Sequence, residues 1–480
     1  MHTSDHPRSP DVRRLVGTLI CCVGLAVSLI GTGIRAGAAA PAPAPEAGQA
    51  IDWLAAQLSA NGGSMPGFTP GSSEWGVTAD AVLAFVAAGR TSDPAATDAT
   101  DHLAANATAF TTWVTDDGFT VRDAGTTAKI VLTLRSMGRA ASAGGVDLEA
   151  ALRSLMETVG DQAGRFSDQV PEPSWNASNG FAQALAMLGL ALTPDGIPPA
   201  AVSFLLHQQC PSGGFRLTYS STSGCTTDAA ADTDATALSL AALLAAPRTP
   251  TVTTALRAGT TWLLSRQAAD GSFGGTGPTA AANTNSTGLI AQYLRAAGET
   301  AAADRAAAWI VGCCQLSTAN STGSPAAGHA GAIAYDPSAF ATGVLDGITA
   351  QAGDQWRRTT TQAVLGLGLA PYGPQSVEPL PPVSVTTTST TTSPTTTTTA
   401  PTTTSPMTTS PSVAPNSTPA PGTATTGVAD ATVEAAGQEN PPSATTLAST
   451  GSDPRPVLGV GVMLLAAGAA SLVASGRRRR

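Results

Sequence analysis

A repeat of about fifty residues, running from roughly Gly48 to Gly373, constrains the fold of this chain more than any other feature. Each copy is marked by an aromatic residue in a loop of small residues, and successive markers lie about 50 to 60 residues apart. The markers are Phe68, Phe119, Phe166, Phe215, Phe273 and Tyr335. A period of this length indicates one supersecondary unit per copy, whose apolar face is buried only when neighbouring copies stack.

Two helices are predicted in each copy. The first precedes the marker, as in 53–57, 204–208 and 262–267, and in the last copy it contains Trp309. The second helices are rich in small apolar residues and span 79–88, 128–137, 181–190, 237–246, 288–297 and 362–370. The position two residues before a hydroxyl residue holds, in every copy, a residue type that is favoured at helix N-caps. We therefore predict the N-caps of the second helices at these positions. These predicted caps are Gly76, Gly125, Asn176, Asp234, Asn285 and Thr359.

The second helices are apolar around most of their circumference, which fits burial on every side. The first helices carry more polar residues and are expected to lie outside them. The predicted fold is therefore all-α, with six helical hairpins closed into an (α/α)6 toroid, or barrel, over residues 48–375. An open solenoid is the alternative, but it would leave apolar faces of the inner helices exposed to solvent.

The pattern Trp-Leu-x-x-x-Gln, a Gly-x-Phe loop and Asp-x-Thr-Ala-Leu resembles the repeat of the squalene cyclase and protein prenyltransferase superfamily. The resemblance covers about two thirds of the chain and implies the same α/α toroid. It implies little about activity, because this scaffold hosts unrelated functions.

Within that resemblance, the segment 232–237, Asp-Thr-Asp-Ala-Thr-Ala, is similar to the DxDDTA motif of cyclases that protonate an alkene or an epoxide. Asp234 holds the position of the proton donor, but Ala235 replaces the aspartate that follows it in the motif. The chain also has few aromatic residues to stabilise a carbocation. Because the matching positions in other copies are Gly, Asn or Thr, we expect Asp234 to be an N-cap rather than a catalytic acid.

A carboxylate pair, such as carbohydrate-active (α/α)6 enzymes use, could also form where several second helices begin. Trp75 and Trp175 each precede a hydroxyl residue by three positions, and they are either packing lids or stacking platforms for a sugar or a flat ligand. The residues predicted to bind a ligand at this mouth of the ring are Trp75, Asp80, Asp123, Trp175, Asn179, Asp232, Asp234 and Asn285.

No metal or other cofactor is predicted. Prenyltransferases hold zinc with Asp, Cys and His, but His329 is the one histidine near Cys313 and Cys314 and no supporting carboxylate pattern accompanies it.

Four cysteines remain beyond the N-terminal segment, and in an exported chain they are expected to be oxidised. Cys210 and Cys225 bracket a loop rich in Ser and Thr, so we predict a disulfide between them. Cys313 and Cys314 are adjacent, and their pairing is left open because other connectivities exist.

The N-terminus has the order of a secretory signal peptide. A polar segment with three arginines is followed by an apolar run at 15–30 and by three alanines ending at Ala40. Residues 1–40 are therefore predicted to be removed, and 41–47 to form a linker. Arg13 and Arg14 raise a twin-arginine route as the alternative to ordinary secretion.

The C-terminus carries the predicted anchor. Residues 376–446 are dominated by Thr, Pro, Ser and Ala and are expected to be a disordered stalk, with a reach on the order of 200 Å. Residues 447–480 contain an LAxTG pentapeptide, an apolar span at 457–475 that is long enough to cross a bilayer, and four terminal arginines. The pentapeptide is Leu447, Ala448, Ser449, Thr450 and Gly451.

This order resembles the sorting signal of Gram-positive cell-wall proteins. The resemblance implies that a sortase cleaves between Thr450 and Gly451 and joins Thr450 to peptidoglycan, after transient membrane anchoring through the apolar span. A plain C-terminal membrane anchor is the alternative.

The whole chain has 24 basic and 33 acidic residues, with no basic face to bind nucleic acid. The sequence thus predicts a toroid displayed on the cell wall that binds a small molecule, a glycan or a partner protein without catalysis. An extracellular enzyme, either cyclase-like or glycan-degrading, is the alternative, and a structural spacer is the third.

Overall fold

A computed structural model describes residues 44–67, 71–219 and 224–373. The predicted signal peptide, stalk and sorting signal, with its span at 457–475, lie outside the described residues, as does Phe68. Among the described residues no helix is both long and apolar enough to span a bilayer.

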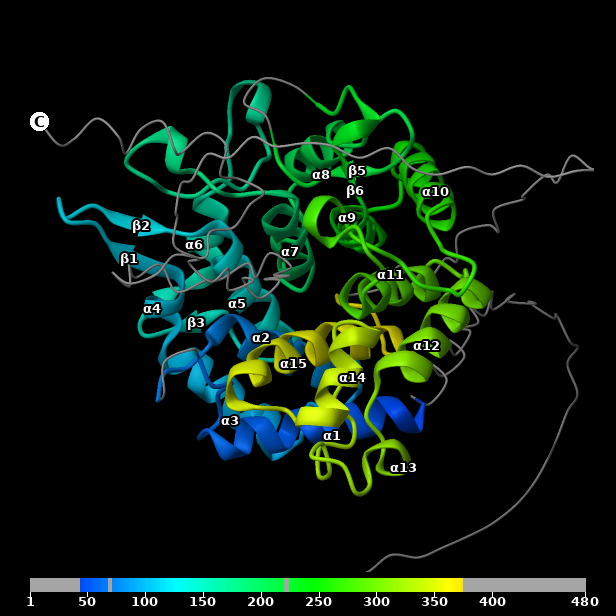
Figure 1. The fold of residues 1–480 in the computed structure, drawn as a ribbon. Helices are drawn as coiled ribbons and strands as arrows, with labels where there is room; N and C mark the ends of the chain where they lie inside the picture. Colours follow the sequence, from blue (N-terminus) through cyan, green and yellow to red (C-terminus); the bar gives the residue numbers. More distant parts are fainter. Residues whose placement is uncertain (1–43, 68–70, 220–223, 374–480) are drawn as a thin grey trace, which may run out of the picture. The chain divides into compact units, whose positions relative to one another are not determined.

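Six inner helices stand side by side in a ring (Figure 1). They are α2 (Trp75–Ala87), α5 (Ala124–Ser136), α7 (Gly180–Ala191), α9 (Thr233–Ala245), α11 (Thr284–Ala296) and α15 (Ala350–Ala363), which the 3-10 turn η5 (Val364–Gly366) prolongs. Each packs against its neighbours in chain order, and α15 with η5 also packs against α2. The ring is therefore closed, which confirms the predicted toroid and excludes the solenoid.

The outer helices cover this ring. They are α1 (Pro45–Ala60), α3 (Pro94–Ala105), α6 (Leu148–Ser154), α8 (Pro199–His207), α10 (Pro250–Leu264) and α12 (Thr300–Cys314). Shorter helices lie in the connections: α4 (Ala107–Thr111), α13 (Thr318–Ser321), α14 (Pro337–Asp346), η1 (Gly160–Gln162), η2 (Pro173–Trp175), η3 (Asp228–Ala230) and η4 (Gly277–Thr279). Three antiparallel strand pairs complete the described fold: β1 (Thr112–Val114) with β2 (Thr120–Arg122), β3 (Ser142–Ala143) with β4 (Val146–Asp147), and β5 (Phe215–Arg216) with β6 (Ala231–Asp232).

Small residues let the inner helices approach one another closely. A Cβ on Gly189 of α7 would lie 3.1 Å from the backbone nitrogen of Leu132 in α5, and one on Gly366 would lie 2.8 Å from the Cα of Gly288. Larger side chains at these positions would force the helices apart, because protein interiors are close-packed. The Ala- and Gly-rich composition of the inner helices is thus a packing requirement of the ring.

Glutamine side chains join successive outer helices. Nε2 of Gln209 donates to the carbonyl of Ala255 at 2.8 Å, and Nε2 of Gln267 donates to that of Ala302 at 2.8 Å. Gln315 makes the equivalent bond to the carbonyl of Glu46 in α1, also at 2.8 Å. The last copy of the repeat therefore contacts the first by the same bond that joins consecutive copies.

Glycines beside these glutamines bring the loop close to the next helix. Gly271 and Gly331 both have a φ of +96°, which side-chain-bearing residues rarely adopt. A Cβ on Gly331 would collide with the carbonyl of Gln49 in α1, as one on Gly271 would with that of Arg305 in α12. A second link closes the ring at the inner layer, where Arg358 of α15 is paired with Glu74 at 3.1 Å.

All six predicted N-caps of the inner helices are wrong. The observed caps are Glu74, Asp123, Asn179, Asp232, Asn283 and Thr349. In four helices the shift is two residues, because the hydroxyl residue used to set the register bonds the cap carbonyl four positions back. Thr236 Oγ1, for example, donates to the carbonyl of Asp232, and Thr287 Oγ1 to that of Asn283 at 2.7 Å.

The sixth inner helix begins about ten residues earlier than predicted. Its first turns are polar, and there Arg358 pairs with Asp354 at 2.8 Å as well as with Glu74. It ends at Ala363 and η5, since Gly368 has a φ of +87° and Pro371 follows. The predicted helical residues 367–370 instead leave the ring wall.

Both cysteine pairs of the described chain are bonded. Cys210 and Cys225 form the predicted disulfide. Cys313 and Cys314 are bonded to each other at the end of α12, which resolves the pairing that the sequence left open.

Replacing Gln315 with leucine should weaken the closure of the ring. The change leaves the carbonyl of Glu46 without this donor, so we expect the free energy of unfolding to fall by about 1 to 2 kcal/mol. Hydrogen exchange should accelerate across α1. The matched variant Gln267→Leu removes the same bond inside the ring and should leave exchange in α1 unchanged; equal effects of both on α1 would contradict a specific closing role.

Candidate functional site

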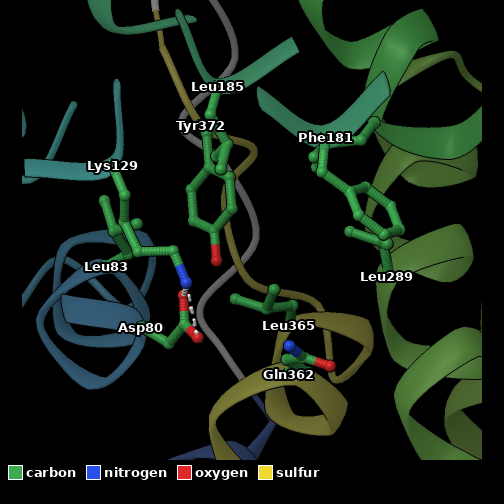
Figure 2. A pocket seen from close by; sticks show the side chains of 10 residues that line it. Asp80, Leu83, Lys129, Phe181, Leu185, Leu289, Gln362, Leu365 and Tyr372 are labelled. Carbon is green, nitrogen blue, oxygen red and sulfur yellow. Dashed lines mark hydrogen bonds and ion pairs between the residues drawn. The ribbon is translucent and has the colours of Figure 1, made fainter. Parts of the chain in front are cut away.

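The inner helices enclose a small cavity at the ring centre. Every inner helix contributes to its wall, together with Leu365 and Tyr372 from the end of the described chain. The wall consists of Asp80, Leu83, Lys129, Phe181, Leu185, Leu238, Leu289, Gln362, Leu365 and Tyr372 (Figure 2). The cavity has a volume of ≈ 60 Å³. This is enough for a few water molecules, since each needs at least about 10 to 15 Å³.

One ion pair lies in this apolar chamber. Lys129 Nζ is 2.9 Å from Asp80 Oδ1, and the lysine side chain is only 4% exposed. Lys129 is the single lysine of the 480-residue chain. Asp80 was expected at the site, whereas Lys129 was missed. The signal that could have found it is the repeat register, because Lys129 follows Thr127 by two positions as Asp80 follows Thr78.

Asp234 is not an N-cap, and the structure corrects that expectation. Asp232 caps α9 by accepting from the backbone of Ala235 at 2.7 Å, and its second oxygen accepts from Thr276. Asp234 lies inside the first turn and is 2% exposed. Ser286 Oγ donates to its Oδ2 at 3.1 Å, while its buried Oδ1 has no hydrogen-bond partner among the described residues.

Burial raises the pKa of Asp234 to about 8, and the charge of Asp232 adds to the effect. The carboxyl group is therefore protonated at neutral pH and able to donate a proton. Asp234 does not line the central cavity, but it lies four residues before Leu238, which does. It thus occupies the turn above the cavity on the same helix face.

Asn285 occupies the equivalent turn of α11, four residues before Leu289. Its Nδ2 donates to Gln362 Oε1 at 2.7 Å, while its Oδ1 is buried and unpartnered within the described chain. The hydroxyl of Tyr335 is likewise buried without a partner there. Unpaired polar atoms are rare in protein interiors, so their clustering near the starts of α9 and α11 indicates a place for water or ligand.

A second carboxylate pair lies at the start of α5. Asp123 caps this helix by accepting from the backbone of Thr126 at 2.7 Å. Asp168, missed by the sequence analysis, accepts from the backbone of Ala124 and of Ala177, each at 2.8 Å. Burial and the charge of Asp123 raise the pKa of Asp168 to about 6. Because backbone amides occupy both carboxyl groups, the pair stabilises the loop before α7.

The remaining predicted residues do not converge on the cavity. Asn179 caps α7 by accepting from the backbone of Phe181 and Ala182. Trp75 begins α2 and packs edge-on against Phe110, with ring centroids 6.1 Å apart. Trp175 lies in η2 and is 54% exposed. The two tryptophans are therefore not equivalent, and no paired platform forms.

The described residues hold no cluster of three or more His, Cys, Asp or Glu side chains that could bind a metal ion. His329, the histidine near the adjacent cysteines, accepts a hydrogen bond at Nδ1 from Trp53 Nε1 at 3.2 Å. It thus takes part in the contact between the last copy of the repeat and the first.

Comparison with known proteins finds similar architectures at low identity. A Candida albicans protein geranylgeranyltransferase-I matches with a TM-score of 0.42 and 11% identity, over 67% of this chain and 93% of its own. A type II terpene cyclase from Scytonema matches with a TM-score of 0.44 and 16% identity, over 67% and 98%. An inactive variant of an α-1,6-mannanase from Salegentibacter sp. matches with a TM-score of 0.44 and 9% identity, also over 67% and 98%.

No protein-family model matches the chain, and no curated protein does. At the identities and scores above, the structural similarities carry no argument about activity. The chemistry of this ring has to be inferred from its own residues.

The stability of the protein should depend on pH through Asp234. Its pKa is about 8 in the folded chain, well above the ordinary value of 3.8. The folded state therefore keeps a proton that the unfolded state releases, and the free energy of unfolding should fall as pH rises from about 4 to about 8. Asp234→Asn should remove more than about 1 kcal/mol of this decline, measured by urea unfolding across that range.

The exposed Asp195 provides the control for this measurement. Asp195→Asn removes a carboxyl group that makes no structural contact of this kind, so its pH profile should match that of the parent protein. If Asp234→Asn also left the profile unchanged, Asp234 would not hold a proton in the folded state.

Proposed function

We propose that this chain is an exported receptor, held at the cell surface by its C-terminal sorting signal, that binds a small amphiphilic molecule at the centre of its ring. The observation that carries the proposal is the Asp80–Lys129 pair inside a chamber whose other lining residues are mainly leucines. Export and wall attachment are supported by the order of the signals in the sequence.

A structural spacer does not require such a pair. Taking two charges out of water costs several kcal/mol per ion, and apolar residues of similar volume would stabilise a core at least as well. A chamber with apolar walls and a few convergent polar groups is typical of ligand sites. The pair therefore favours ligand binding over a purely structural role.

The lining indicates the class of ligand. The five lining leucines and Phe181 suit an alkyl or alicyclic chain, whereas Lys129 donates and Asp80 accepts hydrogen bonds at one side. A chain that ends in a hydroxyl group, or in a carboxyl group that keeps its proton, satisfies both requirements. Because ligand pockets usually exceed about 300 Å³, a bound chain has to displace part of the present wall.

An enzyme is the second candidate, and Asp234 favours it. Its raised pKa keeps an acid protonated at neutral pH, and one of its oxygens is buried and unpaired. Acids with these properties occur at catalytic sites. This overturns the N-cap argument that set catalysis aside, although Asp234 lies one turn from the cavity and not on its wall.

The ligand proposal predicts that the mature chain binds dansyl-labelled undecanoic acid, detected by fluorescence. Dodecanoic acid should compete at least tenfold better than dodecyltrimethylammonium, because its carboxyl group can exchange hydrogen bonds with the Asp80–Lys129 pair, whereas a trimethylammonium head has no donor or acceptor. Lys129→Met should weaken binding at least tenfold, about 1.4 kcal/mol. The control Arg139→Met removes a cation that follows α5 and pairs with Asp101 outside the cavity wall, and it should not weaken binding.

The same assay separates the candidates. Equal affinity for both heads, or an unaffected Lys129→Met, would contradict binding at the ring centre. An enzyme would instead convert an added unsaturated fatty acid to a product with a different chromatographic retention, detected by mass spectrometry. This conversion should be lost in Asp234→Asn.

Wall attachment predicts that Thr450→Ala keeps the protein in the membrane fraction. The parent protein should be released from cells by muramidase, because a sortase joins Thr450 to peptidoglycan, whereas the variant should need detergent. Ser449→Ala changes a variable position of the pentapeptide and should behave as the parent. Release of both proteins by detergent alone would indicate a plain membrane anchor.

A further inference from the structure

The end of the described chain crosses the ring. After η5, residues 367–373, here called the strap, leave the wall between α2 and α11. The backbone of Ala370 donates to the carbonyl of Ala87 at the end of α2 at 3.0 Å, and Gln292 of α11 donates to the carbonyl of Ala370 at 2.6 Å.

The strap then reaches the opposite side of the ring. A Cβ on Gly373 would lie 3.3 Å from Leu188 Cδ2 of α7 and 3.8 Å from Ala245 Cβ, at the end of α9. In the order of inner helices, α7 lies opposite α15 and α9 lies opposite α2. The strap therefore spans the mouth of the ring at which the inner helices end.

Tyr372 points from the strap into the cavity. Figure 2 shows its ring between Leu185 and the Asp80–Lys129 pair, with the hydroxyl directed toward the pair. The side chain is 8% exposed and belongs to the cavity wall. It fills the space that the tail of an amphiphile would need.

The strap is attached differently from the rest of the wall. The other wall residues belong to helices or η5, whose backbone bonds fix them in place. Residues 367–373 have no regular secondary structure, so a displacement of the strap breaks no helix of the ring. Irregular segments open at lower free energy than helices that are packed on every side.

We propose that the strap is a built-in plug of the ring-centre site, and that a ligand enters by displacing Tyr372 through the mouth where the inner helices end. The inference rests on the proposed function, because it assigns the route and the regulation of that same site. The unliganded protein holds its own phenol group where the apolar part of the ligand binds.

Tyr372→Ala in the full mature chain should raise the affinity for dansyl-labelled undecanoic acid at least tenfold. The variant no longer has to expel the ring, and apolar cavities on the order of 150 Å³ bind small apolar molecules. Tyr372→Phe keeps the ring, so it should not show the tenfold gain of Tyr372→Ala. Thermal unfolding with and without the probe checks that the alanine variant is folded. Equal affinity of a folded Tyr372→Ala and the parent would overturn the inference.

A cysteine staple tests the movement itself. Ala87→Cys combined with Ala370→Cys places thiols where the strap meets α2, and the oxidised pair should bind the probe at least tenfold more weakly than the reduced pair. The parent protein, treated with the same reductant, controls for the native disulfides. If the oxidised staple binds the probe as the parent does, the ligand enters elsewhere. The inference that the strap is a plug is then wrong, whereas the proposed ligand-binding function stands. If neither the parent nor Tyr372→Ala binds, the proposed function falls with it.

Discussion

The contact between each loop and the next outer helix is the interaction on which the rest of this structure depends. In the last three copies a glutamine amide and a left-handed glycine make this contact, as in Gln267 with Gly271 and in Gln315 with Gly331. One such bond is worth only about 1 kcal/mol. Its importance is geometric, because it sets the rotation between neighbouring hairpins, and the rotations of six hairpins have to sum to a full turn. The last copy then meets α1 by the same contact.

Closure has a chemical consequence. In an open solenoid, the inward faces of the second helices would remain in contact with water, and Lys129 would be an ordinary solvated charge. The closed ring encloses these faces, so that the pair with Asp80 and the protonated carboxyl of Asp234 lie in an apolar surrounding. Electrostatic interactions are stronger there than in water. The ring thus converts common polar residues into candidate functional groups.

The sequence predicted the class of fold because the repeat is a local pattern. Apolar runs, glycine stops and loop aromatics are read within one copy, and Phe166, Phe215 and Phe273 are buried as their pattern implies. Four of the six helix starts were wrong because the hydroxyl residue bonds the cap carbonyl four positions back rather than following the cap by two. The error decided the interpretation of the site, since it placed Asp234 at the cap that Asp232 occupies.

The candidate site was predictable only in part. Asp80, Asp234 and Asn285 were expected near one another, and they do lie on inward helix faces, whereas Lys129, Asp168 and Tyr372 were missed. Their roles depend on partners far away in the chain: Lys129 lies 49 residues from Asp80, and Tyr372 enters the cavity from the strap. The sequence by itself determined six hairpins of small apolar helices and one disulfide, because these follow from local periodicity and spacing. Only the tertiary structure decided which carboxyl groups are capped, which are protonated and what fills the ring, because burial and charge pairing depend on contacts between copies.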